Sequence, residues 1–364
     1  MFVKNTKFLR GILTGILALA MVGCGARNPS TPAGQEKAIQ VTLTGAGSTF
    51  AYPLLNQQIE AYRKANPSLS INYQGNGSGA GIKQVSEQTI DFGATDGPMT
   101  DDQLNAAKGG TVVQIPLTIG VVAVTYNIPN APKQLKLGPE VLADIFLGTI
   151  TDWNDQRIAT DNPGATLPDL KIAVAHRSDG SGTTYILSDY LSRISPVWFS
   201  KVGKGTSVNW PVGIGGKGNA GVAGAVQHTP GSIGYVELAY AVHNKMPFAT
   251  LLNSEGKWVA PSLKGASVAA VAVASKIPAD MRVSIVNAPG ADAYPIVGFT
   301  WALLYQDQKD KAKGSALVKF LNWSIHDGQT LSEGLLYAKL PPELVTLEEI
   351  MLKTITSEGQ PLLK

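Results

Sequence analysis

Four short turns carry hydroxyl or carboxyl side chains, three of them beside glycine, and each follows an apolar run that predicts a strand. In chain order they are Gly47-Ser48-Thr49-Phe50, Gly77-Ser78-Gly79, Ala94-Thr95-Asp96 and the stretch from Arg177 to Thr184. In three of them a hydroxyl residue comes shortly before a predicted helix. A helix start offers unpaired N–H groups and the positive end of the helix dipole, and glycine lets an anion approach the backbone closely. The turns therefore predict donor clusters for an anion, although a helix cap alone also explains any single one of them.

Two charged groups narrow the kind of anion. Arg177 carries a planar guanidinium that suits a tetrahedral oxyanion, and Asp179 is expected to hold that guanidinium in position. Asp96 would repel an anion unless the anion brings a proton for the carboxylate to accept. Phosphate at neutral pH carries such a proton and sulfate does not, so Asp96 is interpreted as the residue that selects phosphate. A surface ion pair for Arg177 and a plain turn-forming role for Asp96 remain as alternatives.

The start of the chain has the layout of an export signal. Lys4, Lys7 and Arg10 precede the apolar run "GILTGILALAMVG", which is too short to span a bilayer and predicts a signal peptide over residues 1–23. Cys24 is the only cysteine, so no disulfide can form within the chain. Its position directly after "MVG" resembles a bacterial lipoprotein signal, whose cysteine is acylated, although Met21 stands where leucine is usual. A buried thiol after an ordinary signal peptide is the alternative.

The charge of the chain belongs to this signal. The full sequence has 30 basic and 27 acidic residues, and 3 of the basic residues but none of the acidic ones lie in 1–23. The mature chain therefore has 30 − 3 = 27 basic residues against 27 acidic ones, a net charge of zero. Nucleic-acid-binding proteins usually present a basic face, so a nucleic-acid partner is not expected.

The chain from residue 41 alternates short apolar strands with amphipathic helices, which predicts an α/β fold with parallel sheets. With 364 residues, two domains are expected. Strands are expected at "AIQVTLTGAGSTF", "LSINYQ", "TIDFGATD", "TVVQIPL", "IGVVAVTYNIP", "KIAVA" and "YPIVGFTWALLYQ". Helices are expected at "AYPLLNQQIEAYRKA", "IKQVSEQ", "TDDQLNAAK", "GPEVLADIFLG", "TTYILSDYLSRI", "GVAGAVQ", "DKAKGSALVKFLNWSIH" and "GQTLSEGLLYA". The late return to a strand predicts that the chain crosses between two domains twice, with hinges near Tyr126–Pro129 and Tyr294–Val297.

The turns and several longer motifs resemble the extracytoplasmic phosphate-binding proteins of high-affinity phosphate ABC transporters. The matching stretches are "LTGAGSTF", "INYQGNGSGAGIKQV", "DFGATDGPM", "IPLTIGVVAVTYNIP", "RSDGSGTT", "NWPVGIGGKGNAGVAGAVQ" and "PGSIGYVELAYA", in one order from about residue 41 to the C-terminus. Ser48 and Thr95 depart from the alanine and serine that are common in the family, and neither is a ligand in the family pattern.

The resemblance implies a two-lobed periplasmic-binding-protein fold of type II, which closes over one phosphate in the cleft between the lobes. Lobe 1 would comprise residues 41–127 and 296–364, lobe 2 residues 128–295, and residues 24–40 would be a flexible tether. The implied phosphate ligands are Thr49, Phe50 (through its N–H), Ser78, Asp96, Arg177, Ser181, Gly182 (through its N–H) and Thr183, with Asp179 supporting Arg177. The protein is expected to be a monomer without metal or cofactor, lipid-anchored through Cys24 in the periplasm or at the cell surface. It would deliver phosphate to a membrane permease whose ATPase subunits supply the energy.

Three functions are alternatives to phosphate transport. A secreted phosphatase would need a nucleophile and a base, yet no serine fits G-x-S-x-G and the four histidines show no metal spacing. A dinucleotide site at Gly213–Gly218 matches G-x-G-x-x-G by letter but follows Trp210-Pro211 instead of an apolar strand. A sensor or adhesin on the same fold would differ in its partners and not in its site.

Overall fold

The computed structural model describes residues 40–129 and 134–363. The predicted signal peptide, Cys24 and all but the last residue of the predicted tether 24–40 lie outside the described residues. Within these two ranges no helix combines the length and the apolar character that crossing a bilayer requires.

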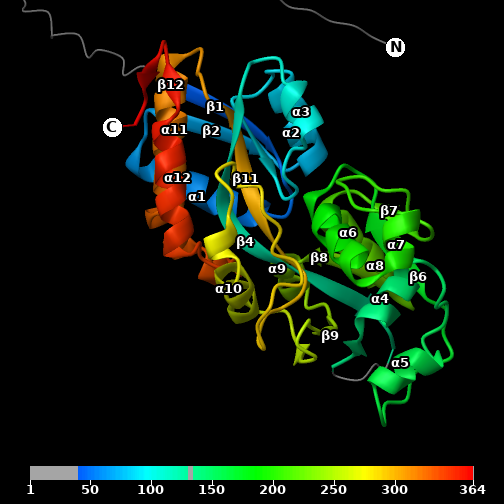
Figure 1. The fold of residues 1–364 in the computed structure, drawn as a ribbon. Coiled ribbons are helices and arrows are strands. Elements are labelled where there is room, and N and C mark those ends of the chain that lie inside the picture. The colour runs from blue at the N-terminus through cyan, green and yellow to red at the C-terminus, as the bar shows by residue number, and fades with distance from the viewer. Residues whose placement is uncertain (1–39, 130–133, 364) are drawn as a thin grey trace, which may run out of the picture. The chain divides into compact units, whose positions relative to one another are not determined.

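An eight-stranded sheet organises the α/β fold (Figure 1). Its strands, in order across the sheet, are β2 (Leu69–Gln74), β1 (Val41–Gly47), β3 (Phe92–Thr95), β11 (Val297–Tyr305), β4 (Val112–Asn127), β8 (Ser232–Glu237), β6 (Ala173–Arg177) and β7 (Ile214–Gly216). The groups β2-β1-β3 and β8-β6-β7 are parallel, as the alternation of strands and helices predicts. β11 and β4 run antiparallel to their neighbours. The sheet is therefore mixed, and the prediction of parallel sheets is wrong for β4 and β11. These two strands connect the halves of the fold, and they run in opposite directions.

Strand β4 belongs to both halves of the sheet. The two separate strands that the sequence predicts here form one strand of 16 residues. Residues 112–121 pair with β11, and residues 122–127 pair with β8. The strand is buried along almost its whole length, which agrees with its nearly continuous apolar sequence.

The β4–β11 pair contains a β-bulge. Thr300 lies opposite Thr118 and Trp301 lies opposite Pro116, so Leu117 is the extra residue on β4. Proline has no N–H to donate to a ladder, and a bulge is where a central strand tolerates it. The carbonyl of Leu117 instead accepts a hydrogen bond from Gln329 Nε2 at 3.0 Å.

Helices follow most strands, as predicted. The α-helices are α1 (Tyr52–Ala65), α2 (Ser78–Ser86), α3 (Asp101–Asn105), α4 (Pro139–Phe146), α5 (Gln156–Asp161), α6 (Gly182–Ile194), α7 (Pro196–Lys201), α8 (Gly218–His228), α9 (Leu238–His243), α10 (Leu263–Val271), α11 (Lys311–Ile325) and α12 (Pro342–Lys353). On α1 the predicted apolar face, which includes Leu54, Leu55 and Ile59, is buried. Figure 1 shows α11 beside β1, which brings the end of the chain against its first strand.

The segment "GQTLSEGLLYA" is not the α-helix that the sequence predicts. It forms two 3₁₀ turns, η2 (Asp327–Leu331) and η3 (Glu333–Leu335), and Leu336 then adopts a left-handed conformation with φ of 67°. Gly328 packs tightly against Gln58 and Trp323, at a position where a side chain would require small shifts of these neighbours. Close packing of the backbone therefore decides this segment instead of helix propensity.

The remaining elements are short. β5 (Lys136–Leu137), β9 (Thr250–Leu252) and β10 (Trp258–Val259) form a three-stranded sheet, β12 (Thr356–Ser357) and β13 (Gln360–Pro361) form a two-stranded one, and η1 (Ala274–Lys276) is a third 3₁₀ turn. One continuous apolar core runs under the large sheet and its helices. This core holds the strands of the large sheet in place.

Candidate functional site

The four turns singled out in the sequence meet at the carboxyl ends of their strands. The turns after β1, β2 and β3 share one edge because these strands are parallel. The second turn contacts the fourth directly, since Gly79 N–H donates to the carbonyl of Gly180 at 2.9 Å. Ligands of open α/β sheets bind at such strand ends. The topology thus brings together residues that lie more than a hundred positions apart in the sequence.

Asp96 is the buried carboxylate of the site, with a relative exposure of 2%. Its Oδ1 accepts hydrogen bonds from Ser48 Oγ at 2.5 Å and from Thr300 Oγ1 at 2.7 Å. Its Oδ2 accepts from Ser78 Oγ at a longer 3.2 Å and faces Gly182 at the start of α6. One carboxylate oxygen is therefore saturated by the protein, and the other faces the helix start of the fourth turn.

Burial raises the pKa of Asp96 to about 6, against hydrogen bonds from Ser48 and Thr300 and the charge of Arg177, which lower it. A carboxylate inside a low-dielectric interior favours its protonated form. Near neutral pH this group can accept a proton or share one with a ligand. That property distinguishes it from an ordinary surface aspartate.

Arg177 ends β6, and its side chain is 1% exposed. Its Nε and Nη2 donate to the two carboxylate oxygens of Asp179 at 2.8 and 2.6 Å, and Nη1 donates to Thr183 Oγ1 at 3.2 Å. Burial acts to raise the pKa of Asp179, but the hydrogen bonds and charge of Arg177 hold it below its usual value. The pair is the bidentate arrangement that fixes a guanidinium in one plane.

Unpaired backbone donors surround these two charged groups. Among the residues that the structure describes, the N–H groups of Phe50, Ser78, Gly182 and Thr183 donate to no protein acceptor. They belong to the turn before α1 and to the first turns of α2 and α6. Ser181 caps α6, since its Oγ accepts from the N–H of Thr184 at 3.0 Å. The helix-cap interpretation therefore holds for Ser181 Oγ, while the neighbouring N–H groups remain available to an anion.

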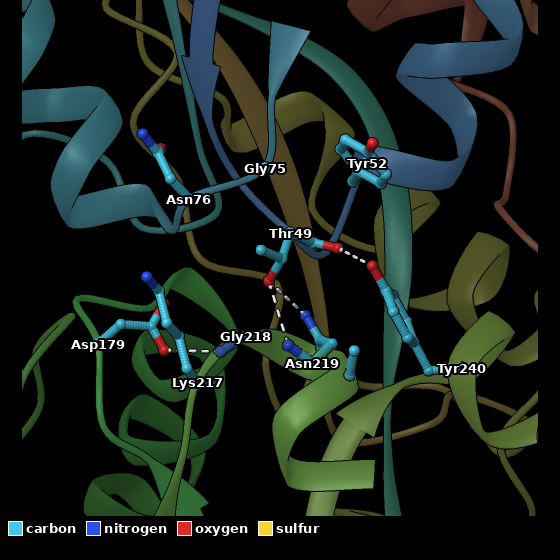
Figure 2. Close-up of a pocket in the computed structure, with 10 residues that line it drawn as sticks. Thr49, Tyr52, Gly75, Asn76, Asp179, Lys217, Gly218, Asn219 and Tyr240 are labelled. Atoms are coloured by element: carbon cyan, nitrogen blue, oxygen red, sulfur yellow. Dashed lines mark hydrogen bonds between the residues drawn. The ribbon is translucent and has the colours of Figure 1, made fainter. Parts of the chain in front are cut away.

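Thr49 contacts helices α8 and α9, which come from the second half of the chain (Figure 2). Its Oγ1 accepts from Asn219 Nδ2 at 2.9 Å and from Asn219 N–H at 3.3 Å, and its carbonyl accepts from Tyr240 Oη at 2.7 Å. Thr49 also lines a cavity of about 380 Å³ together with Asp179, Lys217 and Asn219. The other predicted site residues are outside the lining of this cavity.

Sequence reasoning missed three side chains that complete the site. Ser48 was noted only as a departure from the family pattern, yet it bonds Asp96. Thr300 lies 204 positions after Asp96, and Asn219 lies 170 positions after Thr49. No local pattern could have placed the last two residues, whereas Ser48 stands in a turn that was already singled out.

Two alternative sites find no support in the geometry. His176 stacks on Trp210 with ring centroids 4.9 Å apart, and its Nδ1 contacts the carbonyl of Arg177, so it faces no nucleophile. The loop at Gly213–Gly218 contains strand β7 and leads into α8, which covers the predicted helix "GVAGAVQ". In the described part of the chain no three His, Cys, Asp or Glu residues are grouped closely enough to hold a metal ion.

Comparisons with known proteins identify the family of this chain. A model of the PBP superfamily domain matches residues 30–327. The phosphate-binding protein PstS of Xylella fastidiosa is 46% identical over 319 residues, which cover 87% of this chain and 86% of the relative. PstS of Methanocaldococcus jannaschii is 38% identical, and the match covers 94% of both chains.

The fold is also that of a solved transport receptor. The crystal structure of an ABC-type phosphate transport receptor from Vibrio cholerae is 19% identical and covers 82% of this chain and all of its own, with a TM-score of 0.54. The expected periplasmic-binding-protein fold is confirmed. The chain belongs to the PstS family of phosphate-binding proteins, within the PBP superfamily.

Proposed function

We propose that this protein binds inorganic phosphate outside the cytoplasm and delivers it to the permease of an ABC transporter. The observation that carries the proposal is the buried carboxylate of Asp96, whose Oδ2 accepts only one long hydrogen bond, from Ser78 Oγ, and faces the start of α6, while the charge of the fixed Arg177 guanidinium acts on it. Such a set offers many donors and one acceptor. It suits an oxyanion that keeps one proton, which phosphate does near neutral pH.

The proposed ligands are the eight residues that the family resemblance implies. Hydroxyl donors come from Thr49, Ser78, Ser181 and Thr183, backbone N–H donors from Phe50 and Gly182, a charged donor from Arg177 and the acceptor from Asp96. Asp179 orients Arg177 and meets no ligand. Since a charge-assisted hydrogen bond contributes about 1.5–3 kcal/mol, this set can exceed the roughly 8 kcal/mol of a micromolar complex before desolvation is counted.

Closure of two lobes is the proposed mechanism. We assign residues 41–127 and 296–364 to lobe 1 and residues 128–295 to lobe 2. Support comes from β4, which changes its pairing partner from β11 to β8, and from the contact between Gly79 and Gly180. If phosphate contacts both lobes only in the closed state, binding shifts the population toward that state.

Anchoring and partners complete the proposal. We propose that residues 1–23 are removed, that Cys24 is acylated and that the monomeric mature protein stays tethered to the membrane by residues 24–40. Permease and ATPase subunits would receive the phosphate and drive its import. The PstS relatives are named as binding proteins, which favours binding without catalysis.

Calorimetric titration of the purified mature protein tests this function. We expect phosphate to bind with a dissociation constant at or below about micromolar and sulfate to bind far more weakly at about pH 8. A chromogenic phosphate ester should not be turned over. Absence of phosphate binding by a folded protein would refute the proposal, and turnover of the ester that is lost in Ser181→Ala would favour the phosphatase.

A further inference from the structure

We propose that Asn219 is a positioning residue that makes the Thr49 and Thr183 hydroxyls pure hydrogen-bond donors toward the ligand. The inference rests on the proposed function and concerns the same site. Asn219 is completely buried and is not among the expected ligands. It lies at the start of α8, where its side chain bonds Thr49 from the first turn (Figure 2) and Thr183 from the fourth.

The orientation of the Asn219 amide is fixed by a backbone group. The N–H of Glu237 donates to Asn219 Oδ1 at 2.9 Å. An N–H group can only donate, so the atom that faces it must be the carbonyl oxygen of the amide. The amide nitrogen therefore faces the two threonines, and it has one hydrogen for each.

The lone pairs of both hydroxyls are then occupied. Thr49 Oγ1 accepts from Nδ2 of Asn219 at 2.9 Å and from its backbone N–H at 3.3 Å. Thr183 Oγ1 accepts from Asn219 Nδ2 at 3.2 Å and from Arg177 Nη1 at 3.2 Å. A hydroxyl has two acceptor sites and one proton. Only the proton of each threonine is left to point at a ligand.

This pattern determines where a bound phosphate can keep its proton. A protonated phosphate oxygen facing Thr49 or Thr183 would meet a second donor and no acceptor. Asp96 Oδ2, which accepts only the long hydrogen bond from Ser78 Oγ, is the acceptor that can take the proton of the ligand. Asn219 thus makes the hydroxyls of Thr49 and Thr183 donors to the ligand, while Asp96 provides the acceptor.

Asn219→Asp is the variant that inverts this pattern. One carboxylate oxygen can still accept from Glu237 N–H, but the other becomes an acceptor and draws the two hydroxyl protons away from the ligand. Because each charge-assisted bond contributes at least about tenfold, we expect phosphate affinity to fall by at least about 100-fold. Asn219→Ala leaves the hydroxyls free to rotate toward the ligand and should lose less than about tenfold.

Asn76→Asp is the matched control for charge. Asn76 lines the same cavity and has no hydrogen bond to either threonine, and its Oδ1 is unpartnered. The control introduces a carboxylate without inverting a hydroxyl. Its effect should be smaller than that of Asn219→Asp by at least about tenfold and should shrink in added salt.

A double-mutant cycle distinguishes positioning from structural damage. Phosphate affinity is measured by calorimetry for Asn219→Asp, Thr49→Val and the double variant, after thermal unfolding has shown that each is folded. If Asn219 acts through the Thr49 hydroxyl, its substitution costs at least about tenfold less in the Thr49→Val background. Should Asn219→Asp not fold, the same cycle with Asn219→Ala replaces it, and the small loss caused by Asn219→Ala should vanish.

The outcomes separate the two proposals. Equal losses for Asn219→Asp and Asn219→Ala, a loss no larger than that of Asn76→Asp, or an additive cycle would each overturn the role of Asn219 while leaving phosphate binding intact. Failure of the unmodified protein to bind phosphate would instead overturn the proposed function.

Discussion

Sulfate binding should depend steeply on pH, because sulfate brings no proton to Asp96. In the site an oxygen of sulfate would face Oδ2 of Asp96, two acceptors without a hydrogen between them. A proton taken up by Asp96 removes this conflict. Linkage then requires sulfate affinity to fall about tenfold for each pH unit above the pKa of the unliganded carboxyl, and to level off below that pKa.

The size of the effect follows from burial of Asp96, which raises its pKa to about 6. Sulfate affinity should therefore rise about 50-fold from about pH 8 to about pH 6, and only about twofold more by about pH 5. Phosphate brings its own proton, so its affinity should change by less than about tenfold over the same range. The preference for phosphate is accordingly largest in alkaline solution.

Calorimetric titrations with sulfate at constant ionic strength measure this slope. Asp96→Asn serves as the control, because its amide donates a hydrogen bond at every pH and should bind sulfate with a flat profile. A sulfate affinity that is equal at pH 8 and pH 5 in the unmodified protein would refute the reasoning. A slope that persists in Asp96→Asn would assign the proton to another group.

Three further changes test the site and its surroundings. Arg177→Lys keeps the charge but loses the bidentate geometry, and calorimetry should show phosphate affinity lowered by about 10- to 100-fold; an unchanged affinity would show that charge alone suffices. Gly182→Ala puts a methyl group against Asp96 Oδ2 and should abolish phosphate binding in a folded protein, whereas Gly224→Ala, with open space around it, should bind normally. Burial raises the pKa of Glu237 well above its usual value, so stability falls as pH rises from the unfolded-state pKa toward the higher folded-state pKa. At about pH 8 the free energy of unfolding of Glu237→Gln should therefore exceed that of the unmodified protein by at least about 1 kcal/mol, which thermal unfolding detects as a higher unfolding temperature. Near pH 4 the variant should show no such gain.

Local signals in the sequence were sufficient for the turns. Helix starts depend on a few neighbouring residues, so glycine and hydroxyl residues after an apolar run identify them. Ser181 at the start of α6 and Thr100 at the start of α3 are both N-caps, the latter with a complete capping box. The strand β11 was also predicted from a local signal, since burial on both faces leaves a nearly continuous apolar run, whereas β2 alternates buried with more exposed residues at its start.

Long-range contacts were beyond such signals. Nothing near Thr300 in the sequence indicates that its hydroxyl reaches Asp96, because that contact depends on the pairing of β11 with β3. The partners of Asn219 likewise depend on how α8 packs against the first turn. The antiparallel direction of β4 and β11 was missed because apolar runs do not encode direction.

The β-bulge at Leu117 gives β4 one residue more than the part of β11 with which it pairs. Side chains alternate between the faces of a strand, so one extra residue reverses the phase of β4 relative to β11 beyond that point. Deleting Leu117 would leave Pro116 and Thr118 adjacent in a regular ladder opposite Trp301 and Thr300, and would remove the carbonyl that accepts from Gln329 Nε2. Thr300, which supports Asp96, sits at this phase boundary. An in-frame deletion of one apolar residue would thus remove the local bend and added twist of the strand pair beside Thr300, whose hydroxyl holds Asp96.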